Sequence, residues 1–209
     1  ELIPCDSAEK AVQIFSGLSK EIRFLGGERG GLKPSGFDAG NSPDEYSEEV
    51  VKGRTVVIAT TNGTKIFQKA KQAKLRLIGA FVNINAICFA IDEYMKSEAV
   101  KNKNVFLICA GNSGTLSYED TLCAGAYINY ILRNFEGEEM TDSAHVCKNL
   151  YNLHSRDLKD FLSTRQHAQV LKSLGFEKDI ETALTFDAYP IAPVMTGQGI
   201  KIFDKSMVL

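Results

Sequence analysis

Apolar residues in the first half of the chain form short continuous runs, and most of these runs lead into a polar or glycine-containing turn. The clearest runs are residues 22–25, 54–60, 75–79 and 104–110. Runs of this length without alternation are typical of strands that are covered on both faces, as in a parallel sheet. We therefore predict a strand at each position, and we interpret residues 1–4 as the end of a further strand.

Between these runs, apolar residues recur at helical spacing. The spacing predicts helices over residues 8–19, 64–73, 86–98 and 118–134. A chain that alternates strand, polar turn and helix builds parallel βαβ units with right-handed crossovers. The expected fold is therefore α/β, with a mostly parallel or mixed sheet and flanking helices.

The last third of the chain has a different pattern. Residues 141–151 and 155–174 predict amphipathic helices, and residues 176–203 mix turns with short strands. No internal repeat or linker interrupts the sequence. We expect a single α/β domain over residues 1–209, in which 137–209 is a more helical C-terminal portion.

Composition excludes several classes of partner. The formal net charge of −2 gives no electrostatic basis for binding nucleic acid or acidic membranes. No apolar run approaches the roughly 20 residues that cross a bilayer, and no secretory signal is visible. The five cysteines are odd in number and form no C-x-x-C pair, which is typical of reduced intracellular thiols. We expect a cytoplasmic protein; the sequence leaves its oligomeric state open and is compatible with a homo-oligomer.

Three loops that follow predicted strands are rich in small and polar residues. They cover residues 26–46, 60–64 and 111–120. In open parallel sheets, ligands bind where the carboxyl ends of the strands converge. We therefore expect the three loops to meet and to form the functional site.

The loop of residues 60–64 has the sequence Thr-Thr-Asn-Gly-Thr and precedes a predicted helix. Free amides at a helix N-terminus favour an anion, and threonine hydroxyls add further donors. We name Thr61, Asn62, Gly63 and Thr64 as candidates for binding phosphate or sulfonate. The alternative is that Thr61 or Asn62 only caps the helix, and spacing alone does not separate the two.

The loop of residues 26–46 contains six glycines and two prolines, and structureless loops of this length are uncommon unless they are functional. Arg29 is suited to a bidentate grip on a phosphate or sulfonate. Glu28 and Asp38 are candidates for acid–base chemistry or for Mg²⁺ binding, and Asn41 is a candidate substrate ligand. The alternative is a solvated excursion with ordinary surface charges.

A third set of candidates follows the glycine turn at Gly111, which is itself a candidate substrate ligand. Glu119 and Asp120 open the next helix, where acidic residues usually complement the helix dipole by up to about 1 kcal/mol. Beside the other two loops they become candidates for Mg²⁺, which is held by one or two carboxylates together with substrate oxygens and water. His167 could face the site from the C-terminal helix. Cys109 is a candidate nucleophile only if its thiolate is stabilised.

Taken together, these segments resemble the motifs of the 2-phosphosulfolactate phosphatase family. The resemblance is close from about residue 26 to residue 125, and it continues more loosely through residues 164–175 and Asp179. The segments that carry it are Gly-Gly-Glu-Arg at 26–29, Gly-Phe-Asp-Ala-Gly-Asn-Ser-Pro-Asp-Glu-Tyr at 36–46, Thr-Thr-Asn-Gly-Thr at 60–64, Ile-Cys-Ala-Gly at 108–111, and Gly114, Glu119-Asp120 and Cys-Ala-Gly at 123–125.

The resemblance implies hydrolysis of 2-phosphosulfolactate to sulfolactate and phosphate with Mg²⁺, in coenzyme M-type sulfonate biosynthesis. The expected partner is this small anionic substrate. The residues fit such chemistry, because a small, highly charged substrate needs donor-rich loops, an arginine and a cation. We assign catalysis to Glu28, Arg29, Asp38 and Asp120, substrate binding to Arg29, Asn41, Thr61 to Thr64 and Gly111, and the metal to Asp38, Glu119 and Asp120.

One departure from the family pattern concerns the start of the chain. Family members carry an earlier strand followed by an Asp/Arg-Ala-Thr-Ser motif, and no such residues precede Glu1. We therefore expect that an N-terminal strand segment is missing and that the 209-residue chain has weak or no activity as it stands. Two alternatives remain: a phosphatase of another small phosphate ester, and a non-catalytic anion-binding or nucleotide-binding module. Clustered carboxylates argue against the second, because they repel an anion unless a cation intervenes.

Overall fold

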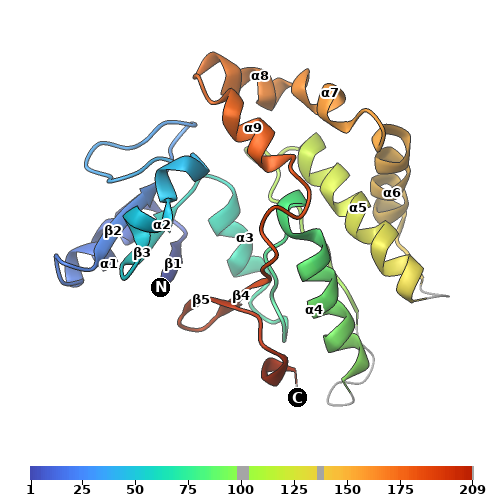
Figure 1. Ribbon diagram of the computed structural model, residues 1–209, viewed down its shortest axis with the longest axis horizontal. Helices are drawn as coiled ribbons and strands as arrows, with labels where there is room; N and C mark the ends of the chain where they lie inside the picture. The colour runs from blue at the N-terminus through green and yellow to red at the C-terminus, as the bar shows by residue number, and fades with distance from the viewer. Residues whose placement is uncertain (98–103, 136–138, 209) are drawn as a thin grey trace.

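The computed structural model describes residues 1–97, 104–135 and 139–208. Figure 1 shows a small sheet with helix α1 on one side of the molecule and a set of longer helices on the other. The strands are β1 (Leu2–Cys5), β2 (Arg23–Gly27), β3 (Thr55–Ala59), β4 (Pro193–Thr196) and β5 (Gly199–Ile202). They form one sheet in the order β2-β3-β1-β5-β4.

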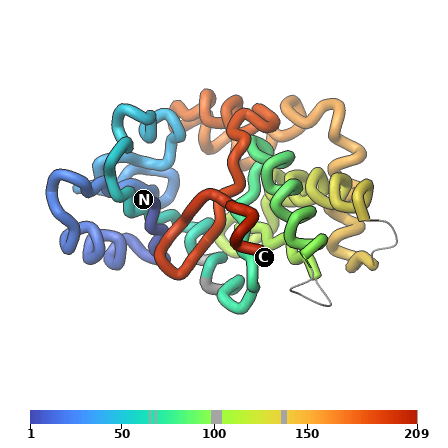
Figure 2. The backbone as a smooth tube through the Cα atoms, turned by 60° about the horizontal axis from the view of Figure 1, so that its bottom comes forward, coloured from blue at the N-terminus to red at the C-terminus, as the bar shows by residue number. Residues whose placement is uncertain are grey.

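The sheet is mixed, which confirms the expected α/β fold. Strands β2, β3 and β1 are parallel, with Val56 of β3 opposite both Phe24 and Leu2. Strand β5 runs antiparallel and joins β1 through the single pair Leu2–Ile200. Figure 2 shows the resulting proximity of the N-terminus to the β4–β5 hairpin. The strands predicted at residues 22–25 and 54–60, and the strand end predicted at residues 1–4, are present.

The three parallel strands are covered on both faces, as the continuous apolar pattern of β3 predicts. On one face Leu25 and Val57 pack with Ala11 of α1 (Ala8–Gly17). On the other face Phe24 and Val56 pack against a segment that includes Val51, the last residue of the short helix α2 (Glu48–Val51). This packing fixes the carboxyl ends of β2 and β3 side by side.

The second core lies between helices. It is built by α4 (Ile84–Lys96) and α5 (Tyr118–Asn134), with Leu122 and Cys88 at its fully buried centre. The remaining helices are α3 (Gly63–Lys69), α6 (Asp142–His154), α7 (Leu158–Ser163), α8 (Gln166–Ser173) and α9 (Glu177–Ala183). None of the helices in the described ranges combines the length and apolarity needed to cross a bilayer.

Two strand predictions were wrong. Within residues 75–79 only Leu77 forms an isolated bridge, to Val194, and residues 104–110 lie outside the sheet with Phe106 80% exposed. Residues 76–78 do bond to β4, but the pairing is too short to form a strand. An apolar run favours extended backbone locally, but a strand also needs a neighbouring backbone along its length. No such neighbour lies beside residues 104–110 in the described part of the chain.

Two helix predictions also need adjustment. The single helix predicted at residues 155–174 is divided into α7 and α8, because Arg165 is extended, with φ −77° and ψ 158°. The helix predicted at residues 86–98 corresponds to α4, although residue 98 lies outside the described residues. The helices predicted at residues 8–19 and 118–134 are confirmed as α1 and α5.

Candidate functional site at the carboxyl ends of β2 and β3

Glu28 joins the first two loops at the end of the sheet. One carboxylate oxygen, Oε1, accepts a hydrogen bond from the Thr61 amide at 2.6 Å. The other, Oε2, accepts from the Thr61 hydroxyl at 3.1 Å and from the Gly31 amide at 2.9 Å. The β2–β3 pairing creates this arrangement, because it continues past the strand ends through a hydrogen bond from the Glu28 amide to the Ala59 carbonyl at 3.1 Å.

The loop of residues 60–64 also contacts the third loop. The side-chain oxygen of Asn62 accepts a hydrogen bond from the Ser113 amide at 3.1 Å. The hydroxyl oxygen of Thr60 accepts a hydrogen bond from the Thr64 amide in the first turn of α3 at 3.3 Å. The Asn62 side chain thus bonds to the third loop and not to an amide of α3, and Thr61 and Asn62 tie the three loops together at the carboxyl end of β2 and β3, which we call the rim.

Asp120 fixes the start of the third loop. Its Oδ2 accepts a hydrogen bond from the Gly111 amide at 2.7 Å, and its own amide donates to the Ser117 hydroxyl at 3.1 Å, which caps α5. Gly111 has φ 71°, and a Cβ atom there would lie 2.6 Å from the Thr115 carbonyl oxygen. Only glycine fits this turn without strain, so the carboxylate of Asp120 is held at a defined place.

The C-terminal helices contribute to the same rim through His167. This residue lies in the first turn of α8, and its Nδ1 is 2.6 Å from Oε1 of Glu119 on α5. The interpretation that His167 faces the site from a C-terminal helix is therefore consistent with its position. Its partner Glu119 directly precedes Asp120, so α8 is linked to the first turn of α5 next to Asp120.

The acidic residues of the rim differ in electrostatic character. Burial raises the pKa of Asp120, and the neighbouring charge of Glu119 raises it further, against a hydrogen bond from Gly111. For Glu119, burial alone would raise the pKa, but the hydrogen bond with His167 and other contacts lower it overall. The same hydrogen bond raises the pKa of His167. Adjacent carboxyls whose pKa values move apart are characteristic of functional sites.

The long loop does not bring all of its candidates to the rim. The guanidinium of Arg29 is turned toward Glu9 of α1, with a separation of 3.9 Å and a side chain that is 79% exposed. Oδ2 of Asp38 accepts a hydrogen bond from the Leu25 amide at 2.8 Å, along the outer edge of β2, where Ala39 also forms an isolated bridge to Gly26. Asn41 lines a shallow hollow on the sheet with Val56 and Ile200.

The predicted metal ligands are distributed accordingly. Asp120 and Glu119 are neighbours at the rim, whereas Asp38 is bonded at the edge of β2. Within residues 1–97, 104–135 and 139–208, no three histidine, cysteine, aspartate or glutamate side chains are grouped so as to hold a metal. The set Asp38, Glu119 and Asp120 therefore does not form a three-residue metal centre in this structure. The physical reason is that Asp38 satisfies the unpaired amide of an edge strand.

The structure also clarifies the role of Cys109 and identifies two residues that the motifs did not single out. Cys109 is exposed as a residue, but partial desolvation of its thiol and the charge of Asp120 raise its pKa to about 11, so a stabilised thiolate is not favoured. Ser117 and Ser113 both support the rim. Ser117 could have been found from the pattern Ser-x-x-Asp, an N-capping signal, whereas the positive φ of 51° at Ser113 has no sequence signature.

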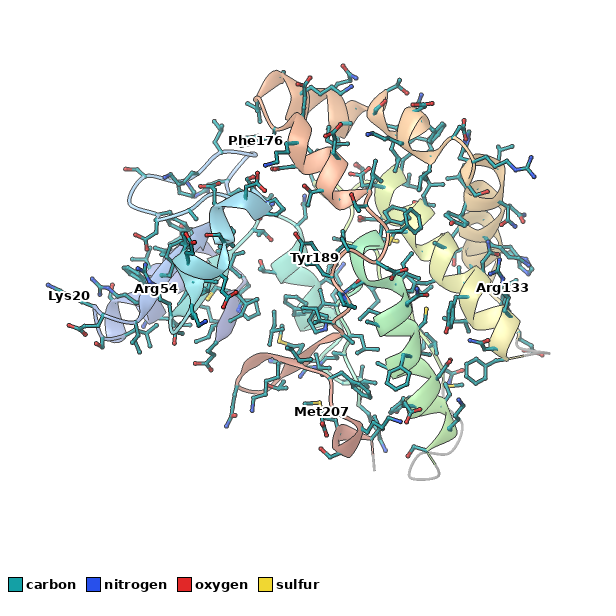
Figure 3. All side chains as sticks on the ribbon, in the orientation of Figure 1. Lys20, Arg54, Arg133, Phe176, Tyr189 and Met207 are labelled. Carbon is teal, nitrogen blue, oxygen red and sulfur yellow. The ribbon has the colours of Figure 1, made fainter. Side chains whose placement is uncertain are left out.

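The loop of residues 26–46 is also bonded to α9, the last of the C-terminal α-helices. The Ser42 hydroxyl donates to Asp179 at 2.7 Å, and Lys178 pairs with Asp44 at 2.5 Å. Figure 3 shows Phe176, which precedes α9, at the point where this loop approaches the helices. The C-terminal helices thus contact two of the three loops, through His167 and through α9.

Comparisons with known proteins identify the family of this chain. The family model described as 2-phosphosulpholactate phosphatase matches residues 1–198. Three relatives have the name "Probable 2-phosphosulfolactate phosphatase". The protein from Thermotoga maritima is 34% identical over 93% of this chain and 78% of its own length. Those from Caldanaerobacter subterraneus and Caldicellulosiruptor saccharolyticus are 33% and 36% identical, over 92% and 89% of this chain and 77% and 75% of their own lengths. The chain belongs to the 2-phosphosulpholactate phosphatase family.

Proposed function

We propose that this chain carries the catalytic rim of a cytoplasmic phosphatase that hydrolyses 2-phosphosulfolactate to sulfolactate and phosphate with Mg²⁺. The product would enter coenzyme M-type sulfonate biosynthesis. Family membership and the names of the relatives support the reaction class and the substrate. The observation that carries the proposal is the meeting of three strand-end loops through the Glu28–Thr61 and Asn62–Ser113 hydrogen bonds.

The charge of the rim supports a requirement for a cation. Glu28, Glu119 and Asp120 are carboxylates at one end of the sheet, and they would repel a phosphate ester at close range. Burial raises the pKa of Asp120 most, and the charge of Glu119 raises it further; a bound cation would favour the charged carboxylate against both effects. Mg²⁺ usually takes only one or two protein carboxylates and completes its shell with phosphate oxygens and water, so a three-residue cluster is not needed.

Within this proposal Asp120 and Glu119 hold the metal, which supplies charge neutralisation and an activated water when it is bound. Asp120 keeps a fixed position because Oδ2 is bonded to the Gly111 amide. The amides that remain unbonded in the loops of residues 60–64 and 111–114 would orient the phosphate and sulfonate groups, since the Thr61 hydroxyl already donates to Glu28. Glu28 acts mainly by holding these loops together, because both of its oxygens accept hydrogen bonds from them.

The test is phosphate release from 2-phosphosulfolactate and from a panel of common phosphate esters, with Mg²⁺ and with EDTA. It should be run on this chain and, for comparison, on the full-length Thermotoga maritima relative. We expect metal-dependent release that is highest with 2-phosphosulfolactate. Preference for another ester would reassign the substrate. Phosphate binding without turnover in either protein would favour a non-catalytic anion-binding module.

A further inference from the structure

Arg165 lies at the corner between α7 and α8, two residues before His167. Its guanidinium carbon is 4.4 Å from the centre of the Phe161 ring and 5.7 Å from the centre of the Tyr118 ring. Tyr118 is the first residue of α5 and directly precedes Glu119, which bonds to His167. Figure 1 shows α7 and α8 above the start of α5. Arg165 is therefore held beside the rim by contacts with both α5 and α7.

The side chain of Arg165 is fixed in this place by hydrogen bonds and by stacking. Its Nε donates to the Phe161 carbonyl at 3.2 Å, and a terminal nitrogen donates to the Thr164 hydroxyl at 2.8 Å. The Phe161 ring is itself fixed, because it stacks on His154 with 3.6 Å between ring centres and packs edge-to-face with Tyr118 at 5.4 Å. A guanidinium that is already ordered loses little freedom when it binds a ligand.

Arg165 differs from other cations near the loops in having no acidic counterpart among the described residues. In that part of the chain no carboxylate forms an ion pair with its guanidinium, whose hydrogen bonds go to uncharged oxygens. By contrast, Arg29 of the loop of residues 26–46 is paired with Glu9, and Lys178 of α9 is paired with Asp44. An arginine has five N–H donors, so most of those of Arg165 remain available for a ligand.

An unpaired guanidinium beside an acidic rim is suited to one kind of ligand group. Glu28, Glu119 and Asp120 make the rim acidic, so an anionic group stays there only if a cation lies close to it. Arginine provides this charge together with a planar fork of donors, which matches two oxygens of a sulfonate or a carboxylate. The guanidinium does not lose its proton in proteins, so the charge is present over the whole working pH range.

The proposed substrate carries a carboxylate and a sulfonate besides its phosphate. The carboxylate is attached to the carbon that bears the phosphate, whereas the sulfonate is attached to the next carbon and lies further from the reacting bond. The proposed position of the phosphate is beside Glu119 and Asp120, while Arg165 reaches Tyr118 at the very start of α5. We infer that Arg165 binds the sulfonate and determines the selectivity of the site for sulfonates. This inference rests on the proposed function, which supplies the substrate and the position of its phosphate.

The experiment measures the binding of small hydroxy compounds to the 209-residue chain by ligand-observed NMR titration with Mg²⁺ present. Sulfolactate carries both a sulfonate and a carboxylate, isethionate carries only the sulfonate, and lactate carries only the carboxylate. We expect Arg165→Ala to weaken binding of sulfolactate and isethionate by about tenfold or more, because charge-assisted hydrogen bonds are lost, and to leave lactate binding unchanged. Arg165→Lys should have an intermediate effect, because an ammonium group keeps the charge but not the fork.

Two further variants separate ligand binding from a purely structural role. Arg165→Gln keeps a side-chain amide that donates to the Phe161 carbonyl but carries no charge, so its midpoint of thermal unfolding should stay normal while sulfonate binding is lost. Arg156→Ala is the matched control, because it removes the same charge from the exposed turn between α6 and α7 and should not change binding. Equal losses for Arg156→Ala and Arg165→Ala, or equal losses for all of the ligands, would contradict the inference.

The other outcomes separate this inference from the proposed function. Loss of lactate binding without loss of isethionate binding would assign Arg165 to the carboxylate, and failure of the unmodified chain to bind sulfolactate would also overturn the inference. Phosphate release is measured separately, from 2-phosphosulfolactate and from 2-phospholactate. If release occurs and Arg165→Ala leaves the preference between these esters unchanged, the inference is wrong and the proposed function stands. Sulfonate binding that depends on Arg165, without phosphate release, would overturn the proposed function alone.

Discussion

Glu28 and Arg29 are adjacent in the chain, but the structure directs them to different places. Glu28 bonds to Thr61 across the end of the sheet, whereas Arg29 points away to Glu9 on α1. The difference comes from the backbone, because β2–β3 pairing extends to Glu28 through the Ala59 carbonyl and ends there. Residues at strand ends therefore form the rim, and residues further along the glycine-rich loop are free to serve other contacts.

The largest expected difference is between two aspartates that the sequence makes equivalent candidates. We expect Asp120→Asn to lower kcat/KM for 2-phosphosulfolactate by about a hundredfold or more, because the charge that would hold Mg²⁺ is lost. Asp38→Asn keeps a side-chain oxygen for the Leu25 amide, so its activity should remain close to that of the unmodified protein. The kcat/KM values of both variants and of the unmodified protein are measured at saturating Mg²⁺. Similar losses of kcat/KM in the two variants would show that Asp38 takes part in the reaction.

A second contrast separates a residue that links two loops from one that acts within a single loop. Glu28→Gln should lower the free energy of unfolding by about 1–3 kcal/mol, because one side-chain oxygen is replaced by an amide group that cannot accept hydrogen bonds from Thr61 and Gly31. The matched control is Glu45→Gln, since among the described residues Glu45 accepts a hydrogen bond from the Gly40 amide alone, at 2.9 Å. Its effect in urea unfolding should be smaller. A reversed order would mean that the Glu28 contacts do not hold the loops together.

The pH dependence of stability tests the contact between α8 and the rim. The folded pKa of His167 is raised, so its contribution is complete below its ordinary value of 6.5 and is lost as pH rises through the folded pKa. The folded pKa of Glu119 is lowered, so its contribution is complete above 4.5 and is lost as pH falls through the folded pKa. Without Mg²⁺, His167→Asn should remove the loss on the alkaline side in thermal unfolding curves. An unchanged curve would show that the pair is not coupled to folding.

The smallest effect is expected at Arg29. Its contact with Glu9 is long and both side chains are largely exposed, and such ion pairs contribute little. Arg29→Ala should therefore leave thermal stability and kcat unchanged within experimental error. A large increase in KM for the substrate would instead show that Arg29 turns toward the rim when an anion binds.

Sequence patterns predicted the helices and strands that depend on neighbouring residues. They did not predict contacts that depend on backbone far away in the chain. Strand β3 and helix α5 were predicted within one or two residues, because their apolar spacing and flanking turns are local signals. Residues 104–110 have the same pattern as β3, but pairing depends on a neighbour that the pattern does not encode. The hydrogen bond from Leu25 to Asp38 could not be predicted either, since it arises from the position of β2 at the edge of the sheet.

The hydrogen bonds of Glu28 have a consequence for how a ligand is received. They hold the loops of residues 26–46 and 60–64 in place before any ligand is present, so the conformational entropy of ordering them is lost during folding and not during binding. Preorganised sites recognise a ligand by fixed shape and charge, and they gain affinity because less freedom is lost on association. A rigid binding site would then distinguish closely related anions by their shape and charge, and the anion that fits would dissociate slowly.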